Sequence, residues 1–514
     1  MKTPRLVQEF LVHTAERVPD KVALICQGKE WRYGELLGGA ARLAHGLRER
    51  GVQRGDRVVI QLPNTAEVVI SIFGTLMADA VFVPVNPSTK IDRLLFILNN
   101  CRATGMIGSG RCLNAAVLHR LRAEVPSLRT IVSCGAPIAG SNDSMVKSLA
   151  QVCEGMPAIP PPSRAIDVDL ACLIYTSGTT GEPKGVMCDH SNVVFASGAI
   201  IEYLENQEDD VVIDVLPISF DYGLYQVLMT FRFGGTLVLE ESFAYPAEIL
   251  QRIERYRVTG LPGVPTLFAM LLRMDLSRYS LGSLRYMTNT AAALPVSHVR
   301  ALRERFPGVK LFCMYGLTET KRTLYLPPAY LDSKCGSVGI PIPGTEAWIE
   351  DETGRRLGPG EVGELVVRGR HVMRGYWADP VATSERFRPG PIPGERLCYT
   401  GDLFRMDEDG FFYFVARKDD IIKTRGEKVA PREVEDVLHA LEGVAEAAVV
   451  GLPDPVLGQA LKAVIVPARP GLSAAEVLAH CRAHLEDFKV PRWVEFRDSF
   501  PRSPSGKVRK EELV

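Results

Sequence analysis

Residues 175–185 read Tyr-Thr-Ser-Gly-Thr-Thr-Gly-Glu-Pro-Lys-Gly, a loop made of glycines, hydroxyl side chains and one lysine. Glycine lets the chain turn tightly, and backbone N–H groups together with hydroxyls bind anions, so a polyphosphate is the natural ligand of such a segment. The apolar run before it, residues 170–175, is predicted to be a buried strand. A strand that leads into a phosphate-type loop favours nucleotide binding.

The spacing of this loop differs from that of the commonest phosphate-binding loops. Gly178 and Gly181 are too close together for GxxxxGK[ST], and Lys184 follows a proline instead of a glycine. A kinase-type GxGxxG loop is absent from this segment as well. On composition alone, a plain hydroxyl-rich surface turn remains the alternative.

Helical and extended patterns alternate through the first 400 residues. Short apolar strands are predicted at 57–62 and 81–85, with an apolar segment of helix length at 65–80 between them. A helix is predicted at 33–50, followed by Gly51 as a stop signal, and its apolar stripe consists of Leu36, Leu37, Ala40, Leu43 and Leu47. This alternation predicts an α/β fold with mostly parallel sheets flanked by helices.

The pattern changes near residue 416. Asp409-Gly410 lies between aromatic segments and signals a hairpin. Beyond it, strands are predicted at 447–451 and 461–466, and one helical stripe is formed by Val434, Val437, Leu438 and Leu441. We therefore predict a large N-terminal domain of residues 1–416 and a small α+β C-terminal domain of residues 417–514.

Composition narrows the functional class. The chain has 514 residues, more than a single core usually supports, and its formal net charge is −1. Such a balance supplies no basic field for nucleic acid or an anionic membrane surface. Its eleven cysteines form no CxxC pair, which indicates reduced thiols. Without a signal peptide or a long apolar span, we expect a cytoplasmic protein with no membrane span and no nucleic-acid partner.

Seven motifs along the chain resemble those of the adenylate-forming ligases, the family of acyl-CoA synthetases, firefly luciferase and the adenylation domains of nonribosomal peptide synthesis. The first is the decapeptide 176–185. The others follow in the family's order and at about its spacing: Met314-Tyr-Gly-Leu-Thr-Glu319, Gly363-Glu-Leu-Val-Val-Arg-Gly369, Gly375-Tyr-Trp377, Tyr399-Thr-Gly-Asp402, Arg417-Lys-Asp-Asp420 and Ser505-Gly-Lys507. The resemblance covers nearly the whole chain.

The resemblance implies that a carboxylate attacks the α-phosphorus of ATP and gives an acyl adenylate and pyrophosphate. Such a reaction needs positive charge and donors around the phosphate oxygens. The implied phosphate-binding residues are Thr176, Ser177, Gly178, Thr179, Thr180, Gly181 and Lys184. Thr318 would contact the α-phosphate and Glu319 would hold Mg²⁺. Tyr315 and Gly316 would lie at the adenine, and Asp402 with Arg417 at the ribose.

The second half of the implied reaction is attack on the adenylate by a thiol, either of CoA or of phosphopantetheine on a carrier protein. Lys507 matches the family's lysine that bridges the substrate carboxylate and phosphate during adenylation. Asp419 matches the hinge, and rotation about it would replace Lys507 with the face that carries Lys423 and Gly426. No carrier domain is attached, so a carrier protein would be a separate chain.

The substrate-binding segment around Phe220 and Asp221 leaves two interpretations open. This pair resembles amino-acid-activating domains, in which the aspartate binds the substrate ammonium. A buried carboxylate needs a cation, and Arg322 is the alternative source within the protein. Tyr222 and Tyr225 indicate a compact pocket. We expect a small amino or imino acid that is loaded on a carrier protein, with a fatty or aromatic acid handled by an acyl-CoA synthetase as the alternative.

Other classes are less consistent with the motifs. A noncatalytic nucleotide-binding protein would not need Glu319, Asp402 and Lys507 together. A phosphotransferase would lack the Gly506-Lys507 motif and would release ADP. Luciferase-type oxidation of the adenylate uses the same motifs, so the motifs alone do not separate it from thioester formation.

Overall fold

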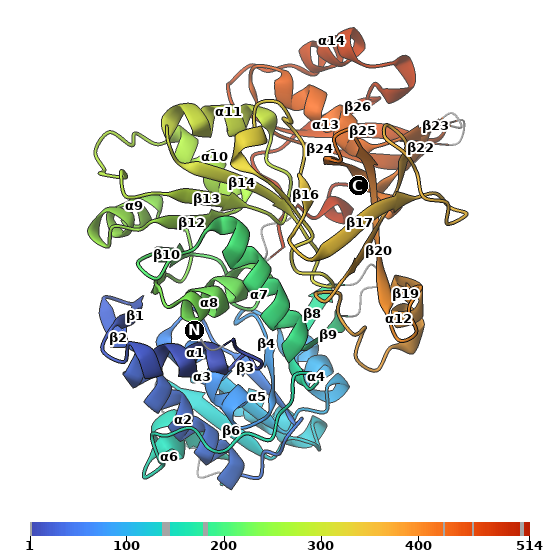
Figure 1. Cartoon of the computed structure of the whole chain (residues 1–514). Helices are drawn as coiled ribbons and strands as arrows, with labels where there is room; N and C mark the ends of the chain where they lie inside the picture. The colour runs from blue at the N-terminus through green and yellow to red at the C-terminus, as the bar shows by residue number, and fades with distance from the viewer. Residues whose placement is uncertain (1–2, 136–143, 178–182, 425–426, 455–456, 504–507) are drawn as a thin grey trace.

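The computed structural model describes residues 3–135, 144–177, 183–424, 427–454, 457–503 and 508–514. Figure 1 shows two sheets built mainly from parallel strands, with the C-terminal residues gathered around a separate sheet at the upper right. Among these residues, no helix is both long and apolar enough to cross a membrane.

The first sheet has the strand order β7-β6-β5-β3-β4-β8-β9 and is parallel except for the β8–β9 hairpin at its edge. Its strands are β3 (Arg57–Gln61), β4 (Val81–Pro84), β5 (Gly105–Ser109), β6 (Thr130–Cys134), β7 (Val146–Ser148), β8 (Leu170–Ser177) and β9 (Pro183–Asp189). Residues 175–177 and 183–185 of the phosphate-type segment therefore lie on the two strands of this edge hairpin.

The second sheet has the order β16-β15-β14-β13-β12-β10-β11-β1-β2. Its six central strands are parallel, and antiparallel strands close both edges. The strands are β1 (Val22–Cys26), β2 (Lys29–Arg32), β10 (Val211–Asp214), β11 (Thr236–Leu239), β12 (Gly260–Gly263), β13 (Tyr286–Asn289), β14 (Lys310–Tyr315), β15 (Leu324–Leu326) and β16 (Ile340–Pro341).

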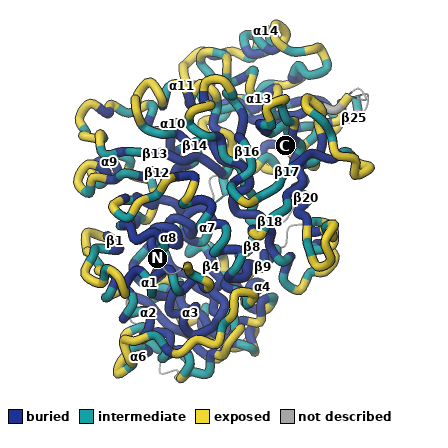
Figure 2. The backbone as a smooth tube through the Cα atoms, viewed as in Figure 1, coloured by how far each residue is buried: buried dark blue, intermediate teal, exposed yellow. Residues whose placement is uncertain are grey.

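Helices cover both faces of these two sheets. Because side chains alternate along a strand, Val58 and Ile60 of β3 belong to the core shared by the two sheets, whereas Val59 belongs to the core under the outer helices. The shared layer contains α1 (Glu9–Arg17), α2 (Tyr33–Glu49), α3 (Ala66–Met77), α7 (His190–Leu204) and α8 (Asp221–Phe233). The outer helices are α4 (Ile91–Asn100) and α5 (Ala115–Glu124) on the first sheet, and α9 (Pro246–Arg255), α10 (Pro265–Arg273) and α11 (Val296–Arg305) on the second. Figure 2 shows the shared layer as continuous dark blue.

A third, antiparallel sheet follows along the chain. Its order is β17-β18-β20-β19, with β21 on β20. The strands are β17 (Thr345–Glu350), β18 (Val362–Gly369), β19 (Phe387–Pro389), β20 (Arg396–Met406) and β21 (Phe412–Arg417). The remaining short elements of the N-terminal part are α6 (Leu149–Cys153), α12 (Pro380–Arg386) and the 3₁₀ turn η1 (Pro328–Tyr330).

The C-terminal residues form their own sheet and core. The sheet has the order β23-β22-β25-β24, with β26 parallel to β25, and its hydrophobic clusters draw only on residues from Ile422 onward. Its elements are β22 (Ile422–Thr424), β23 (Glu427–Val429), α13 (Pro431–Ala440), β24 (Val444–Asp454), β25 (Gly458–Pro467), α14 (Ala474–His484) and β26 (Trp493–Phe496), with 3₁₀ turns η2 (Lys418–Asp420), η3 (Asp487–Lys489) and η4 (Lys510–Glu512).

The predicted fold class is confirmed, and so are the individual elements. The predicted helix at 33–50 is α2, and Gly51 past its end has φ +83°, a left-handed conformation that glycine adopts easily. The strands at 57–62 and 81–85 are β3 and β4, and Gly410 turns between β20 and β21. The domain boundary at 416/417 and the mobility of the C-terminal part remain predictions.

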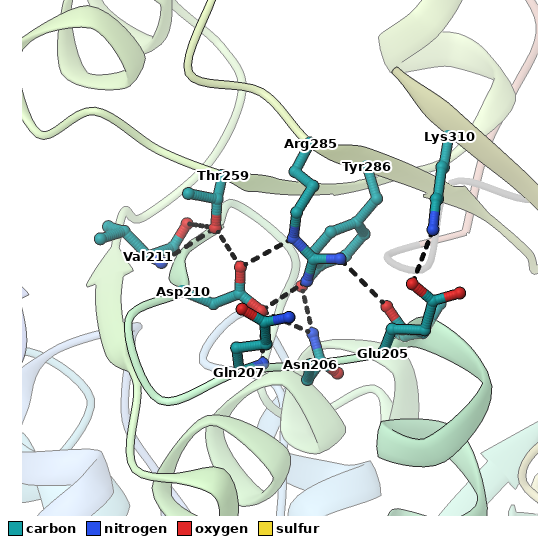
Figure 3. A network of polar contacts seen from close by, with 10 residues as sticks. Glu205, Asn206, Gln207, Asp210, Val211, Thr259, Arg285, Tyr286 and Lys310 are labelled. Atoms are coloured by element: carbon teal, nitrogen blue, oxygen red, sulfur yellow. Dashed lines mark hydrogen bonds and ion pairs between the residues drawn. The ribbon is translucent and has the colours of Figure 1, made fainter. Parts of the chain in front are cut away.

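A buried polar network ties together the amino ends of the second sheet (Figure 3). Asp210 directly precedes β10 and accepts hydrogen bonds from Arg285, Thr259 and the Gln207 N–H. Burial alone would raise the pKa of Asp210, but these donors hold it below its ordinary value. Since this network occupies the amino ends of the strands, the carboxyl ends of β12, β13 and β14 are left for ligands, as is usual in open parallel sheets.

Candidate active site

The β8–β9 hairpin carries the predicted phosphate-binding residues. Its register pairs Tyr175 with Gly185 and Thr176 with Lys184, and Thr176 Oγ1 donates to the Lys184 carbonyl at 3.5 Å. The tip, with Gly178, Thr179, Thr180 and Gly181, lies outside the described residues, as does the side chain of Ser177. In the described part of the hairpin, Lys184 lies beside the residues of the candidate active site.

Tyr376 connects this hairpin to Glu319. Lys184 Nζ lies 5.5 Å from the centroid of the Tyr376 ring, and the Tyr376 hydroxyl donates to Glu319 Oε1 at 2.5 Å. The neighbouring Trp377 N–H donates to the Gly185 carbonyl at 2.7 Å, which holds this segment against the hairpin. Lys184, which is predicted to bind phosphate, therefore lies near the ring of Tyr376. Glu319, which is predicted to hold Mg²⁺, lies at the hydroxyl of the same tyrosine.

Arg386 adds a cation to this group. It is the last residue of α12 and donates to the Tyr399 carbonyl at 3.0 Å. Burial opposes charge on Arg386, but the field of Glu319 and Tyr376 raises its pKa, so the guanidinium stays charged. Burial and the Glu319 carboxylate together also raise the pKa of Tyr376. Glu319 thus accepts a hydrogen bond from a phenol and lies in the electrostatic field of a buried guanidinium.

The loop between β14 and β15 positions Thr318 and Glu319. A Cβ on Gly316 would lie 2.0 Å from the Lys321 carbonyl oxygen, so only glycine allows the loop to fold back so closely. The Thr323 N–H donates to the Tyr315 carbonyl at 2.9 Å and closes the loop. The Glu319 carbonyl also accepts the Met373 N–H at 3.0 Å. These contacts fix the Glu319 backbone at the carboxyl end of β14.

Tyr315 and Asp402 meet, as expected for residues that bind one nucleoside. The Tyr315 hydroxyl donates to Asp402 Oδ2 at 2.6 Å, and the ring packs edge-on against Phe404. Burial and the Asp402 carboxylate raise the pKa of Tyr315. Arg417 is the register partner of Asp402 across β20 and β21, and its Nε lies 3.7 Å from Asp402 Oδ1. An aromatic face and a carboxylate with acceptor oxygens suit adenosine.

The predicted substrate residues lie at the start of α8. Phe220 caps the helix, and Asp221, Tyr222 and Tyr225 are buried. The Tyr222 hydroxyl donates to the Thr288 carbonyl at 2.8 Å and accepts the Gly263 N–H at 3.2 Å, so it ties the start of α8 to the carboxyl ends of β12 and β13. This arrangement is consistent with a compact acyl pocket.

The expected ion pair between Asp221 and Arg322 is not formed. Among the described residues, no hydrogen bond or ion pair within 4.0 Å joins these two side chains. Arg322 instead stacks on Tyr222, with its Cζ 4.6 Å from the ring centroid. The cation that feels the Asp221 carboxylate is Lys321, whose pKa that carboxylate helps to raise. Lys321 was not among the expected partners of Asp221, because a buried lysine is rare.

In the C-terminal part, the structure describes Lys423, which is predicted for thioester formation, and the predicted hinge residue Asp419. Lys423 is exposed on β22, and its backbone N–H donates to Gln459 Oε1 at 2.8 Å. In the described part of the chain, no hydrogen bond or ion pair links the Lys423 side chain to Glu319 or Asp402. Asp419 is exposed within η2. Lys507 lies outside the described residues.

Sequence reasoning missed several residues of the site. Tyr376 was visible in the Gly375-Tyr-Trp motif, but nothing in the sequence pointed to its bond with Glu319. Arg386 carries no local signal. Glu364, within a quoted motif, accepts the Gly401 N–H at 2.9 Å and lies 3.3 Å from Lys418 Nζ, and so supports the turn that presents Asp402.

Comparisons with known proteins agree with this geometry. Residues 11–377 match the model of the AMP-binding enzyme family, and residues 433–507 match that of the AMP-binding enzyme C-terminal domain. A long-chain-fatty-acid–CoA ligase of Bacillus subtilis (strain 168) is 32% identical over 535 residues, covering 99% of this chain and 94% of the relative. A feruloyl-CoA synthase of an Amycolatopsis species is 34% identical over 507 residues, covering 98% of this chain and 97% of the relative.

Among solved structures, the anthranilate CoA ligase AuaEII in complex with anthranoyl-AMP superimposes with a TM-score of 0.91. It is 27% identical in sequence, and the match covers 100% of this chain and 97% of that chain. The predicted family is thereby confirmed: the chain belongs to the AMP-binding enzymes and is an AMP-forming ligase.

Proposed function

We propose that this protein is an acyl-CoA synthetase. A carboxylate oxygen attacks the α-phosphorus of ATP, the bond to the β-phosphate bridging oxygen breaks, and pyrophosphate leaves. The sulfur of CoA then attacks the acyl carbon, and AMP leaves with the electron pair of the C–O bond. The observation that carries this proposal is the continuous line of Lys184, Tyr376 and Glu319 beside Tyr315 and Asp402.

The residues fit ATP and a hard divalent cation. Asp402 and Tyr315 would hold the nucleoside, which leaves the phosphates between the hairpin and Glu319. In the described residues, no three His, Cys, Asp or Glu side chains cluster as a metal site. Mg²⁺ bound through one carboxylate and phosphate oxygens matches that arrangement, because Mg²⁺ commonly retains water and substrate ligands. When bound, it would offset phosphate charge, and Glu319 is the residue to hold it.

An acyl-CoA product is better supported than amino-acid loading on a carrier protein. The relatives named above are CoA ligases for fatty and aromatic acids, whereas our main expectation was an amino or imino acid. The pocket points the same way. Lys321 and Arg322 are both buried next to Asp221, and two nearby cations disfavour a substrate ammonium there. Buried Tyr222 and Tyr225 favour a compact acid over a long chain.

Product analysis tests the proposal. The purified protein is incubated with ATP, Mg²⁺, CoA and a panel of aromatic, fatty, dicarboxylic and amino acids. We expect acid-dependent AMP and pyrophosphate, loss of free CoA thiol, and hydroxamate formation when hydroxylamine replaces CoA. Release of ADP would indicate a phosphotransferase, and absence of both products with every acid would contradict the proposal. Amino acids as the sole substrates, with activity lost in Asp221→Ala, would restore the ammonium-anchor interpretation.

A further inference from the structure

Two consecutive cations are buried in the loop between β14 and β15. Lys321 is 1% exposed and Arg322 is 4% exposed, and both lie in the loop that also carries Thr318 and Glu319. Lys321 has φ +56°, a left-handed conformation that is uncommon for a residue with a side chain. The turn therefore separates the two parts of the loop, with Glu319 at Tyr376 and Arg322 at Tyr222.

Arg322 donates far fewer hydrogen bonds to described residues than a guanidinium can. A guanidinium has five N–H donors, and in the described part of the chain one of them is used, in a bond from Nη1 to the Lys321 carbonyl at 3.0 Å. No described carboxylate lies within 4.0 Å of it. Its remaining surroundings are tyrosines: Tyr222 beneath the guanidinium, and Tyr203 and Tyr225 in its electrostatic field. Burial of a cation without a counter-charge costs several kcal/mol.

Lys321 is buried beside it without a hydrogen bond. Its Nζ has no hydrogen-bond partner among the described residues and lies 5.8 Å from the Tyr225 ring centroid. The Tyr225 hydroxyl also has no described partner. Burial would lower the pKa of Lys321, but the Cys188 thiol and the Asp221 carboxylate raise it above its ordinary value, so the ammonium is retained. Burial would raise the pKa of the Cys188 thiol, but Cys172 and the Lys321 charge lower it, so Lys321 is offset by Asp221 and Cys188 together. Arg322 has no such partner within 4.0 Å among the described residues.

The position of Lys321 and Arg322 indicates which chemical group would neutralise their charge. Arg322 stacks on the tyrosine whose hydroxyl is fixed to Thr288 and Gly263 at the carboxyl ends of β13 and β12. Tyr222 follows Phe220 and Asp221 at the start of α8, the segment predicted to bind the acyl group. A planar guanidinium with free donors binds a carboxylate through two parallel hydrogen bonds. An acid with a single carboxylate leaves this cation unpaired once that carboxylate is at the phosphates.

We propose that the acyl substrate is a compact dicarboxylic acid, whose second carboxylate is bound by Arg322, with Lys321 contributing positive charge. This inference rests on the proposed acid activation and specifies its substrate class. The second carboxylate takes no part in bond making. It fixes the substrate so that the first carboxylate faces the α-phosphate, and it supplies the missing counter-charge.

The test compares diacids with their monomethyl esters, which remove one charge and keep nearly the same shape. The panel contains straight-chain diacids of three to eight carbons, the three benzenedicarboxylates and their monoesters. Acid-dependent pyrophosphate release gives kcat/KM for each, and thermal-shift titration with the same acids reports binding without turnover. We expect at least one diacid to exceed its ester by roughly 100-fold in kcat/KM, as for recognition of a buried charge.

Variants of Arg322 test whether this residue causes the preference for the diacid over its monoester. Arg322→Gln removes the charge and is expected to lower kcat/KM for the diacid roughly tenfold or more beyond any change that it causes for the monoester. Arg322→Lys keeps the charge without the planar fork and should retain part of the preference. Arg300→Gln, at an exposed position on α11, is the matched control. Circular dichroism and melting temperature show whether each variant is folded.

The outcomes separate this inference from the function on which it rests. Neutral acids activated as well as diacids, or Arg322→Gln lowering both classes equally, would overturn the dicarboxylate inference and leave the acyl-CoA synthetase standing. If no acid yields pyrophosphate and no diacid shifts the melting temperature, both the proposed function and this inference fail.

Discussion

The hydroxyl of Tyr376 donates a 2.5 Å hydrogen bond to Glu319 Oε1, although 56 residues lie between them in the chain. The same ring faces Lys184 Nζ at 5.5 Å. Tyr376 therefore aligns a carboxylate that would hold Mg²⁺ with a lysine of the phosphate hairpin. A charge-assisted bond to a buried carboxylate is stronger than a bond between neutral groups.

Removal of this hydroxyl should slow adenylation. In Tyr376→Phe the ring remains over Lys184, but Glu319 loses one of its donors, and loss of a hydrogen bond to a charged group costs about 1.5–3 kcal/mol. We expect kcat for pyrophosphate release to fall roughly tenfold or more, with an altered Mg²⁺ dependence. Tyr413→Phe removes a different tyrosine–carboxylate bond, to Asp407 in the β20–β21 hairpin, and is the control. Equal effects of the two substitutions would contradict the role given to Tyr376.

Much of the fold follows from the sequence because strongly periodic segments have one stable solution. β3 and β4 lie between two helical layers, and α3 lies in the layer shared by the two sheets. All three are apolar on nearly every side, so their pattern was unambiguous. The order of strands was not predictable, since long-range pairing such as that of β4 with β8 depends on how whole layers pack. The sequence also gave no reason to expect an antiparallel β9 at the edge of that sheet.

In the candidate site, too, some residues could be predicted from the sequence and others could not. Tyr315 and Asp402 could be placed together because each lies in a motif, and the structure joins them by a 2.6 Å bond. Lys321 and Arg386 could not be identified, because their importance comes from burial beside residues distant in the chain. A lysine is nearly always exposed, and only the folded loop shows that Lys321 is not.

Neutralisation of Asp402 should weaken ATP binding. Asp402→Asn keeps an oxygen for the Tyr315 hydroxyl but removes the charge, and its amide presents donors where the ribose hydroxyls would donate. We expect the KM for ATP to rise roughly tenfold while the KM for the acid changes little. Initial rates at varied ATP measure this effect. Asp407→Asn, in the hairpin beyond the site, serves as the control, and an unchanged KM for ATP in Asp402→Asn would remove Asp402 from the nucleotide site.

Lys507 and Lys423 should act in different half-reactions if the C-terminal residues rotate about Asp419. We expect Lys507→Ala to reduce adenylate formation by roughly 100-fold, the loss typical of a group that contacts developing charge. Thioester formation from a supplied acyl adenylate should change little, and Lys423→Ala should show the opposite pattern. Lys510→Ala, which removes a contact with Glu435, is the control. Loss of both steps to the same extent in Lys507→Ala would contradict the two-state hinge.

Gly316→Ala tests the closeness of the β14–β15 loop. The added methyl would lie 2.0 Å from the Lys321 carbonyl oxygen, so the loop must open, which moves Thr318, Glu319 and Arg322 together. We expect a loss of about 1–3 kcal/mol in the free energy of unfolding, as for overpacking elsewhere, and nearly complete loss of pyrophosphate release. Gly282→Ala is the matched control, because no atom lies within 4 Å of its added Cβ. Full activity in Gly316→Ala would show that the loop tolerates opening.

Acid should destabilise the protein through His190. Its Nδ1 accepts the Val7 N–H at 3.1 Å, and burial, only partly offset by nearby carboxylates, lowers its pKa from 6.5 to about 4. The unfolded state therefore binds the extra proton first as pH falls. The contribution of neutral His190 to the free energy of unfolding is complete above pH 6.5 and declines between pH 6.5 and 4, by up to about 3 kcal/mol.

Urea unfolding at several pH values measures how steeply the free energy of unfolding depends on pH. His190→Gln keeps an acceptor and cannot titrate, so its slope should be shallower, whereas His119→Gln, at an exposed position, should match the native protein. The same slope in His190→Gln and the native protein would assign the acid sensitivity to other groups.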